Sequence, residues 1–378
     1  MSVATHKLTS TNAFVIFDLE DAETASGLVR CAPKILPSSA KELARSATYT
    51  FAAHGCKRGG ASAGINAKGS ERDEAVRAFT EEIAEMVVAG KFLPDAGRGV
   101  TEEDLLPLRA SDMRGDAHFS KQGFTEDASS KYNSTTLATY LQGVSAVAAT
   151  EAALGALEGR TVALEGFGPA GLAAAKELEE RGAKVVAVAT AAGMSKAAAG
   201  FSHAELAEAF AAHGQEMVEH LETGSMKKHI ETGQGRETEQ DRETEQGREA
   251  NSIWSVEADI FFAGSKIGAV DHNVAELFSP MALVSLTPLA FTTKALIALQ
   301  QKGTKVLPDF VCLGGPIYAE GEIPSADEAI ATARTNTAAL VDEAEGHPEG
   351  IFLGVCAIAE QFLLTWRDEL PFGRPLAP

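Results

Sequence analysis

The sequence predicts an α/β protein with two domains: an N-terminal mixed α/β domain, followed by a domain built on parallel strands. Its 378 residues are enough for about two domains of ordinary size. Strand-like and helix-like segments alternate from residue 160 onward, an order typical of parallel βαβ units. A glycine-rich turn at 166–171 separates the first such strand from its helix. We expect the first domain over 1–135, the second over 136–350, and a C-terminal helix in 351–378 that packs back.

Composition and charge narrow the classes of function. The chain is 45% apolar and 23% charged, and its formal net charge is −20 at pH 7. Because such an acidic chain repels phosphate backbones and anionic lipid, we expect neither nucleic acid nor a membrane as a partner. No apolar run reaches the roughly 18 residues of a membrane span, and the first residues do not resemble a secretory signal. We therefore expect a cytoplasmic enzyme that acts on a small molecule.

The cysteines and histidines do not predict a metal site. The four cysteines are Cys31, Cys56, Cys312 and Cys356, and none of them forms a C-x-x-C pair. The histidines are scattered and lack the spacing of zinc ligands. We expect no metal, and we interpret the cysteines as reduced thiols.

In the first half of the chain, three segments have the pattern of regular elements. Residues 13–18 (AFVIFD) predict a strand, and residues 41–54 have the composition of a helix. Residues 70–89 predict the clearest helix, with Ser70 as its N-cap and Gly90 as its stop. These elements predict a mixed domain that contributes substrate contacts.

The second half predicts the parallel sheet. Strands are expected at 160–165, 184–189, 259–263, 282–285 and 305–308. Helices are expected at 134–157, 170–181, 204–212, 293–302 and 351–362. The first of these helices is rich in small residues, which suits the junction between two domains.

Two segments do not have the pattern of regular elements. Residues 91–130 are rich in Asp, Gly and Pro and are expected to be irregular. Residues 222–250 contain RETEQ at 236–240 and again at 242–246. A polar repeat without an apolar stripe cannot bury enough surface to order itself, so we predict a mobile surface insertion. A partner-binding segment is the alternative.

The glycine-rich turn predicts a Rossmann-type dinucleotide-binding domain. It follows the strand-like VALE, opens the helix-like LAAAKELEE, and is followed by a second strand. Gly166 would permit the tight turn, Gly168 the approach of a pyrophosphate, and Gly171 the packing of helix on strand. The residues expected to contact the cofactor here are Gly166, Phe167, Gly168, Pro169, Ala170 and Gly171.

The choice between NAD and NADP stays open. An NAD site usually carries Asp or Glu at the end of the second strand, where it binds the ribose hydroxyls. That position is Thr190 in this chain. Lys196 could bind a 2′-phosphate or could simply be solvated. The expected cofactor is therefore NAD or NADP.

Several stretches resemble, in order, the glutamate/leucine/phenylalanine/valine dehydrogenase superfamily. The closest is GRTVALEGFGPAGLAAAKELEERGAKVVAVA at 159–189. The others are LARSATYTFAAHGCKRGGASAGI at 43–65, LPDAGRGVTEEDL at 93–105, TTLATYLQGVSAVAATEAALG at 135–155, EADIFFAGSKIG, SLTPLAFTTKA and VLPDFVCLGG. The resemblance implies an NAD(P)-dependent enzyme that deaminates amino acids, and by analogy a homo-oligomer.

The resemblance also implies site residues. The family's proton-transferring aspartate corresponds to Asp95, although a turn aspartate is the alternative interpretation. The lysine that holds the substrate carboxylate corresponds to Thr50, the lysine that activates water to Ser62, and the substrate-orienting asparagine to Leu289. Further contacts are expected from Gly60 and Ala61 on the substrate side and from Thr136, Gly264 and Ser265 on the cofactor side.

These replacements alter the expected substrate. A buried carboxylate without a cation costs several kcal/mol, whereas a neutral hydrogen bond from Thr50 contributes about 1 kcal/mol. We therefore expect hydride transfer at an amine, imine or carbonyl carbon of a substrate less anionic than an ordinary amino acid. A catalytically inactive dinucleotide-binding homologue is one alternative. A reductase for a bulky neutral substrate, suggested by Leu289 and Phe291, is another.

Overall fold

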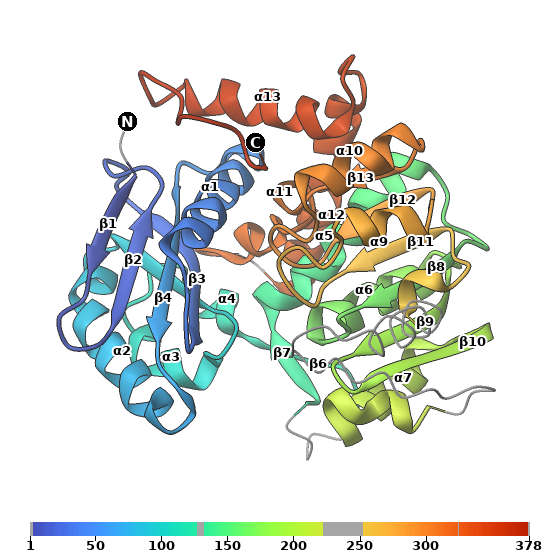
Figure 1. Ribbon diagram of the computed structural model, residues 1–378, viewed down its shortest axis with the longest axis horizontal. Helices are drawn as coiled ribbons and strands as arrows, with labels where there is room; N and C mark the ends of the chain where they lie inside the picture. The colour runs from blue at the N-terminus through green and yellow to red at the C-terminus, as the bar shows by residue number, and fades with distance from the viewer. Residues whose placement is uncertain (1–2, 127–131, 222–251, 324, 377–378) are drawn as a thin grey trace, which may run out of the picture. The chain divides into compact units, whose positions relative to one another are not determined.

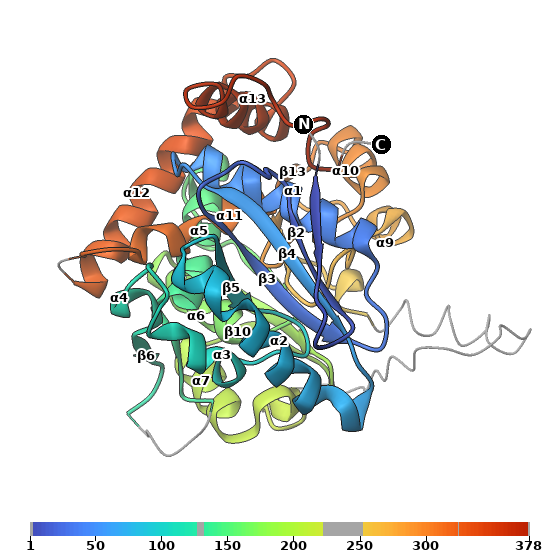
Figure 2. The same cartoon turned by 90° about the vertical axis from the view of Figure 1, so that its left-hand side faces the viewer.

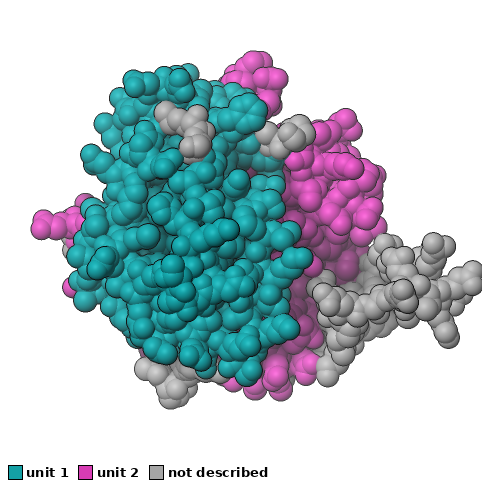
Figure 3. Space-filling model, turned by 60° about the vertical axis from the view of Figure 1, so that its left-hand side comes forward, with its two compact units in different colours: residues 1–115, 355–378 teal, residues 116–354 magenta. Residues whose placement is uncertain are grey.

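The computed structural model describes residues 3–126, 132–221, 252–323 and 325–376. The chain forms two compact units, which Figure 3 shows in different colours. Unit 1 comprises Met1–Gly115 and Val355–Pro378, and unit 2 comprises Asp116–Gly354. The division therefore falls earlier in the chain than the predicted boundary at 135. The predicted insertion at 222–250 lies outside the described residues.

Unit 1 is built on a mixed sheet of five strands in the order β1-β2-β4-β3-β5. β3 is parallel to both β4 and β5, while β2 is antiparallel to β1 and β4. The strands are β1 (Ala4–Lys7), β2 (Ala13–Phe17), β3 (Ala25–Ala32), β4 (Gly59–Asn66) and β5 (Phe92–Ala96). The sequence pattern predicts only β2, because β4 consists largely of Gly, Ala and Ser and has low strand propensity.

Helices cover both faces of this sheet (Figures 1 and 2). α1 (Pro37–Ala53) packs against Phe14 and Ile16 on one face. α2 (Arg72–Val88) buries Phe79, Ile83 and other apolar side chains on the opposite face. The predicted helices at 41–54 and 70–89 are thus confirmed, but Ser70 lies in a 3-10 turn before α2 and is not its N-cap.

The stretch 91–130 is more ordered than we expected. In unit 1 it contains β5 and α3 (Glu102–Arg109), which Thr101 caps through the Asp104 amide (3.3 Å). In unit 2 it contains α4 (Asp116–Phe119) and β6 (Lys121–Gly123). β5 and β6 are short and are held by pairing with β3 and with β7 (Ser134–Thr136), so the local pattern does not reveal them.

Unit 2 contains the predicted parallel sheet, with strand order β10-β9-β8-β11-β12-β13. Its strands are β8 (Thr161–Glu165), β9 (Lys184–Thr190), β10 (Gly193–Phe201), β11 (Ile260–Ala263), β12 (Ala282–Ser285) and β13 (Lys305–Leu307). All neighbours are parallel except β10, which forms an antiparallel hairpin with β9. The strand order reverses at β8, as it does in Rossmann-type sheets.

The helices of unit 2 pack around this sheet. They are α5 (Leu137–Leu154), α6 (Pro169–Glu180), α7 (His203–His213), α9 (His272–Leu277), α10 (Thr293–Gln301), α11 (Asp309–Cys312) and α12 (Ala326–Glu345). α5 packs along both α6 and α12. Because parallel crossovers are right-handed and the order reverses at β8, α6 lies on the face opposite α9 and α10.

The predicted C-terminal helix is α13 (Ile351–Leu363). Within unit 1 it is tied to α1 by a hydrogen bond from the Tyr49 hydroxyl to Glu360 Oε1 (3.0 Å). Arg374, in the segment after α13, binds the same carboxylate with two bonds of 2.6 Å. Among the described residues, no helix is long and apolar enough to cross a membrane.

Candidate functional site

The glycine-rich turn lies at the carboxyl end of β8, where the strand order reverses. Gly166 has φ of 72°, and a Cβ there would lie 2.1 Å from the Ser265 amide nitrogen. Glycine therefore lets this turn touch the loop that follows β11. Gly264 and Ser265 begin that loop, so the structure brings these three predicted residues together. This edge of the sheet is where open α/β folds bind ligands.

The start of α6 has the geometry of a phosphate cradle. Gly168 is its N-cap and has an extended backbone, and Pro169 begins the helix. A Cβ at Gly168 would meet no described atom within 4 Å, so the space beside its backbone is open. Within the described chain, the amides of Ala170 and Gly171 have no acceptor, as expected for the first turn of a helix. The residues present therefore fit a dinucleotide pyrophosphate.

Glu165 is a buried carboxylate that the sequence pattern does not single out. Its Oε2 accepts the amides of Gly264 and Ser265, each at 3.1 Å. Burial raises the pKa of Glu165, and the hydrogen bonds from Ser265 and Gly264 partly offset that rise. Glu165 thus links the ends of β8 and β11 directly beneath the glycine turn. In the sequence, only its position at the end of a predicted strand could have pointed to Glu165.

Thr190, where an acidic residue would indicate NAD, lies at the tip of the β9–β10 hairpin. Its hydroxyl donates to the Gln215 carbonyl (2.5 Å) and accepts the Ala192 amide (3.2 Å). The Gln215 side chain donates in turn to the carbonyl of Phe167 in the glycine turn (3.3 Å). Gln215, which the sequence analysis missed, therefore connects the two segments predicted to contact the cofactor.

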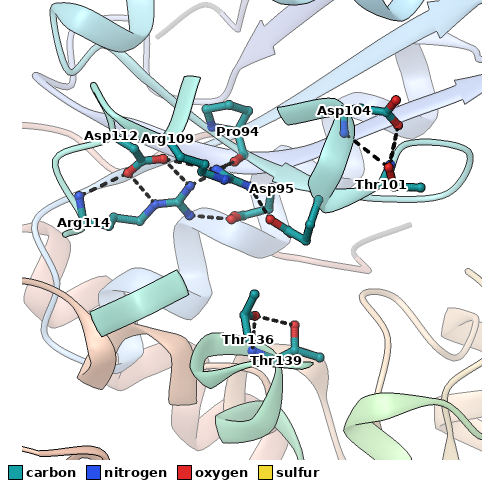
Figure 4. Close-up of polar contacts among 10 residues, drawn as sticks. Pro94, Asp95, Thr101, Asp104, Arg109, Asp112, Arg114, Thr136 and Thr139 are labelled. Atoms are coloured by element: carbon teal, nitrogen blue, oxygen red, sulfur yellow. Dashed lines mark hydrogen bonds and ion pairs between the residues drawn. The ribbon is translucent and has the colours of Figure 1, made fainter. Parts of the chain in front are cut away.

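Thr136 is the N-cap of α5. Its Oγ1 accepts the Thr139 amide at 3.2 Å and lies 3.0 Å from the Thr139 hydroxyl (Figure 4). The Thr136 hydroxyl thus satisfies one amide in the first turn of the helix. A structural role as a cap therefore accompanies the predicted cofactor contact of Thr136.

The predicted substrate residues of unit 1 lie on α1, β4 and β5. The Thr50 hydroxyl donates to the Ser46 carbonyl within α1 (3.0 Å), and the Gly60 amide donates to the Thr48 hydroxyl (2.9 Å). Ser62 is fully buried, and its hydroxyl has no hydrogen-bond partner in the described part of the chain. Ala61 is also buried, on the opposite face of β4. Gly60, Ala61, Ser62 and Asp95 therefore share one sheet, whereas Thr50 lies on α1, which packs against that sheet.

Asp95 belongs to an ion-pair network that the sequence analysis missed (Figure 4). Its carboxylate pairs with Nη1 of Arg114, whose side chain is 2% exposed. Arg114 also binds Asp112, with bonds of 2.9 and 2.7 Å, and the Pro94 carbonyl (2.9 Å). Arg109 contacts the same Asp112 carboxylate at 3.3 Å and the Pro94 carbonyl at 2.9 Å.

The two carboxylates keep Arg114 charged. Burial by itself would lower the pKa of Arg114, but Asp95 and Asp112 outweigh that effect and raise the pKa above its usual value. Arg114 is therefore a fixed cation beside Asp95. The chain forms α3 between β5 and Arg114, so only the folded chain brings Arg114 to Asp95.

Leu289 has a backbone conformation that leucine seldom adopts. Its φ is 52°, in the left-handed region that favours Gly and Asn. Its amide donates to Asp309 Oδ2 (3.0 Å), and its carbonyl accepts the Gly268 amide (2.8 Å). Leu289 is buried and links the loops after β11 and β12. This conformation would suit the asparagine expected from the resemblance.

The sequence model of the glutamate/leucine/phenylalanine/valine dehydrogenases matches residues 131–326, just over half of the chain. The chain belongs to this family. Its fold class is accordingly that of the family: a mixed α/β domain with a Rossmann-type domain. Enzymes of this family use NAD or NADP. A search of curated protein sequences finds no match.

Solved structures of the family share the fold at low sequence identity. The hetero-hexameric glutamate dehydrogenase of Thermus thermophilus, in a Leu-bound form, is 20% identical with a TM-score of 0.68, covering 96% of this chain and 87% of its own. Glutamate dehydrogenase of Plasmodium falciparum is 15% identical with a TM-score of 0.70, and the match covers 94% of this chain and 79% of that protein. L-tryptophan dehydrogenase of Nostoc punctiforme is 16% identical with a TM-score of 0.58, and the match covers 97% of this chain and 95% of that protein. At such identities the likeness establishes the fold alone.

The structure therefore groups the cofactor candidates more tightly than the substrate candidates. Gly166, Gly264 and Ser265 meet at one edge of the unit 2 sheet, and Gln215 joins Thr190 to that edge. In unit 1, Ser62 and Asp95 lie on strands that flank β3, roughly 10 Å apart at ordinary strand spacing. No cluster of three metal-ligating side chains occurs among the residues that the structure describes.

Proposed function

We propose that this protein is an NAD(P)-dependent oxidoreductase that transfers hydride at an amine, imine or carbonyl carbon of a small substrate. Membership of the dehydrogenase family supports the reaction class. The observation that carries the proposal is the open space beside Gly168, at the start of α6 and next to the contact of Gly166 with Ser265. When bound, the nicotinamide cofactor supplies the hydride chemistry, and the residues of this chain position it.

The cofactor would lie across the carboxyl edge of the unit 2 sheet. The free amides of Ala170 and Gly171 would bind the pyrophosphate, and Thr190 would face the adenosine ribose. Thr190 carries no charge, so it neither requires NAD nor repels the 2′-phosphate of NADP. We therefore propose either nucleotide as the cofactor. We also propose a homo-oligomer, by analogy with the family.

The substrate side supports an uncharged or weakly anionic substrate. The residues proposed to contact it are Thr50, Gly60, Ala61, Ser62 and Leu289, with Asp95 as the proton-transferring group. Neither Thr50 nor Ser62 can neutralise an α-carboxylate as a lysine does. Asp95 would accept or donate the proton that accompanies hydride transfer.

A catalytically inactive, dinucleotide-binding homologue is the second candidate. Two observations favour it: Arg114 engages the Asp95 carboxylate, and the Ser62 hydroxyl is buried. In this alternative, unit 2 still binds the nucleotide, but unit 1 performs no proton transfer. The two candidates therefore differ in turnover and agree in cofactor binding.

Cofactor titration followed by a substrate screen tests the proposal. Binding of NADH and NADPH is followed by the fluorescence of the reduced nicotinamide, and turnover by its absorbance with amines, keto acids and amino acids. Binding with turnover supports the oxidoreductase, whereas binding without turnover on a broad panel supports the inactive homologue. Failure of both nucleotides to bind would refute both candidates.

Gly168→Val sharpens the binding test. Its backbone is extended and the space beside it is open, so valine should fold normally while its side chain blocks the pyrophosphate. We expect the Kd for NAD(P)H to rise by at least about tenfold, or roughly 1.4 kcal/mol, with an unchanged melting temperature. Gly69→Val is the matched control, because a Cβ at Gly69 also meets no described atom within 4 Å and lies in unit 1. Unchanged affinity in Gly168→Val would exclude this turn as the binding site.

A further inference from the structure

Unit 2 contains a hollow of about 330 Å³ among α5, α12 and the residue that ends α6. This volume is in the range of small-molecule sites. The hollow lies at the C-terminal end of α6, whereas the glycine turn lies at its N-terminal end. A helix of 12 residues is about 18 Å long, so the hollow is distinct from the proposed cofactor site.

Two arginines form the positive side of the hollow, and both are held in place by Glu177, whose side chain is 1% exposed. Arg181 Nη1 lies 3.0 Å and Arg334 Nε lies 2.8 Å from Glu177 Oε2. Arg181 Nε also donates to Glu151 Oε2 (2.6 Å). These bonds fix the planes of both guanidinium groups.

Each of these arginines keeps an unused nitrogen. In the described part of the chain, Arg181 Nη2 and Arg334 Nη1 donate to no acceptor. Guanidinium N–H groups bind carboxylates strongly, particularly when their orientation is already fixed. This side of the hollow therefore suits a carboxylate.

Two carboxylates, those of Asp342 and Glu151, also line the hollow and could bind a positively charged group. Asp342 is exposed and has no ion pair or hydrogen bond to any described residue. Glu151 uses Oε2 for Arg181, which leaves Oε1 available. The remaining lining includes the methyl groups of three alanines, Ala148, Ala152 and Ala338. Ammonium and short aliphatic groups are therefore accommodated as well.

The balance of charge selects among ligand classes. Arg181 and Arg334 are outnumbered by four carboxylates, those of Glu151, Glu177, Asp342 and Glu180, the last of which binds Arg334 Nη2 at 3.2 Å, so a simple anion is not attracted. A simple cation would face two arginines. A zwitterion satisfies both sets of groups at once. We propose that this hollow binds a free α-amino acid with a short aliphatic side chain. The ligand lies outside the proposed reaction site, and its binding does not depend on the proposed reaction.

Calorimetry with L-valine and its two half-molecules tests the ligand class. The full protein is titrated without cofactor with L-valine, with 2-methylpropylamine, which lacks the carboxylate, and with 3-methylbutanoate, which lacks the ammonium group. We expect L-valine to bind at least about tenfold more tightly than either half. Absence of valine binding up to about 10 mM, or equal binding of one half-molecule, would overturn the proposal.

Three variants on α12 locate the binding. Ala338→Phe fills the hollow and should weaken valine binding by at least about tenfold. Asp342→Asn removes an exposed charge and should weaken it by about threefold without disturbing the fold. Asp327→Asn, at the exposed start of the same helix, is the matched control and should have no effect. If Asp342→Asn binds valine as tightly as the unaltered protein, the hollow is not the site, whatever Ala338→Phe does.

Discussion

Replacing Arg114 with methionine should destabilise unit 1 far more than removing its exposed partner does. The Arg114 side chain is 2% exposed and the Asp112 side chain is fully buried. Removing one member of a buried ion pair costs about 3–5 kcal/mol, because the other charge remains buried. Arg109 still contacts Asp112 at 3.3 Å in the variant, so we expect the lower end, about 3 kcal/mol. Asp95 is 37% exposed, so Asp95→Asn should cost less than about 1 kcal/mol.

Urea unfolding with a probe confined to unit 1 measures this difference. The chain has two tryptophans, Trp254 in unit 2 and Trp366 in unit 1, so Trp254→Phe in every variant leaves Trp366 as the reporter. With a slope of about 2 kcal/mol per M, Arg114→Met should lower the urea midpoint by about 1.5 M, and Asp95→Asn by less than about 0.5 M. Equal, small shifts in both variants would refute the reasoning that a buried charge is left behind.

The stability difference between the original protein and Arg114→Met should also depend on pH, with a definite sign. Burial raises the pKa of Asp112, but its bonds to Arg114 outweigh this, so the folded-state pKa is lowered. The stability contributed by Asp112 is therefore present above the ordinary pKa of about 4 and is lost as the pH falls through the folded-state value. Without Arg114, the lowering effect of Arg109 remains, but burial is less fully offset, so the pKa of Asp112 should be higher than in the original protein. The stability difference between the original protein and Arg114→Met should thus narrow below about pH 4, and a constant difference would contradict this account.

Three further predictions follow from other buried polar groups. Because the pKa of Glu165 is raised in the folded state, the folded protein binds that proton more tightly than the unfolded chain does. Stability should therefore fall as the pH rises from the pKa of the unfolded state through that of the folded state. Glu165→Gln should remove this loss, as measured by unfolding between pH 4 and 9. Ser62→Ala should change stability by less than about 0.5 kcal/mol, because the Ser62 hydroxyl has no partner among the described residues. Ser62→Lys should cost more than about 3 kcal/mol, because it buries a charge. A stable Ser62→Lys protein would show that this face of β4 opens to solvent. Glu177→Gln should destabilise unit 2 by about 3 kcal/mol and Glu180→Gln, at 48% exposure, by less than about 1 kcal/mol, as measured by Trp254 fluorescence in a Trp366→Phe background.

The strands of the two units differ in how well local sequence predicts them. In unit 2, β8, β9 and β12 are runs of apolar and β-branched residues buried on both faces, and such runs identify parallel strands. β4 of unit 1 (GGASAGIN) has the opposite composition. Small residues are needed there because α1 packs so close that a Cβ at Gly60 would lie 1.9 Å from the Ala44 carbonyl oxygen. This demand for small residues comes from packing and is invisible to strand propensity.

The candidate site divides in the same way. The sequence alone predicts the glycine turn, because its spacing, the strand before it and the helix after it are local features. The ends of the β8 and β11 segments are about 100 residues apart in the chain, so only the folded sheet brings Glu165 to the Ser265 amide. The same is true of Arg114 and Asp95, which come from a loop and a strand, and of Gln215, which joins Thr190 to the turn.

The sequence by itself therefore determined the α/β class, the order along the chain of the unit 2 strands other than β10, and the glycine-rich turn between β8 and α6. Each depends on the identity of residues within a few positions of one another. Tertiary structure decided which carboxylates are buried and bonded, namely those of Glu165, Asp112 and Glu177. It also decided which guanidinium nitrogens of Arg181 and Arg334 have no acceptor among the described residues. Burial and pairing depend on side chains brought together from distant segments, and they set the charge, pKa and accessibility on which chemistry depends.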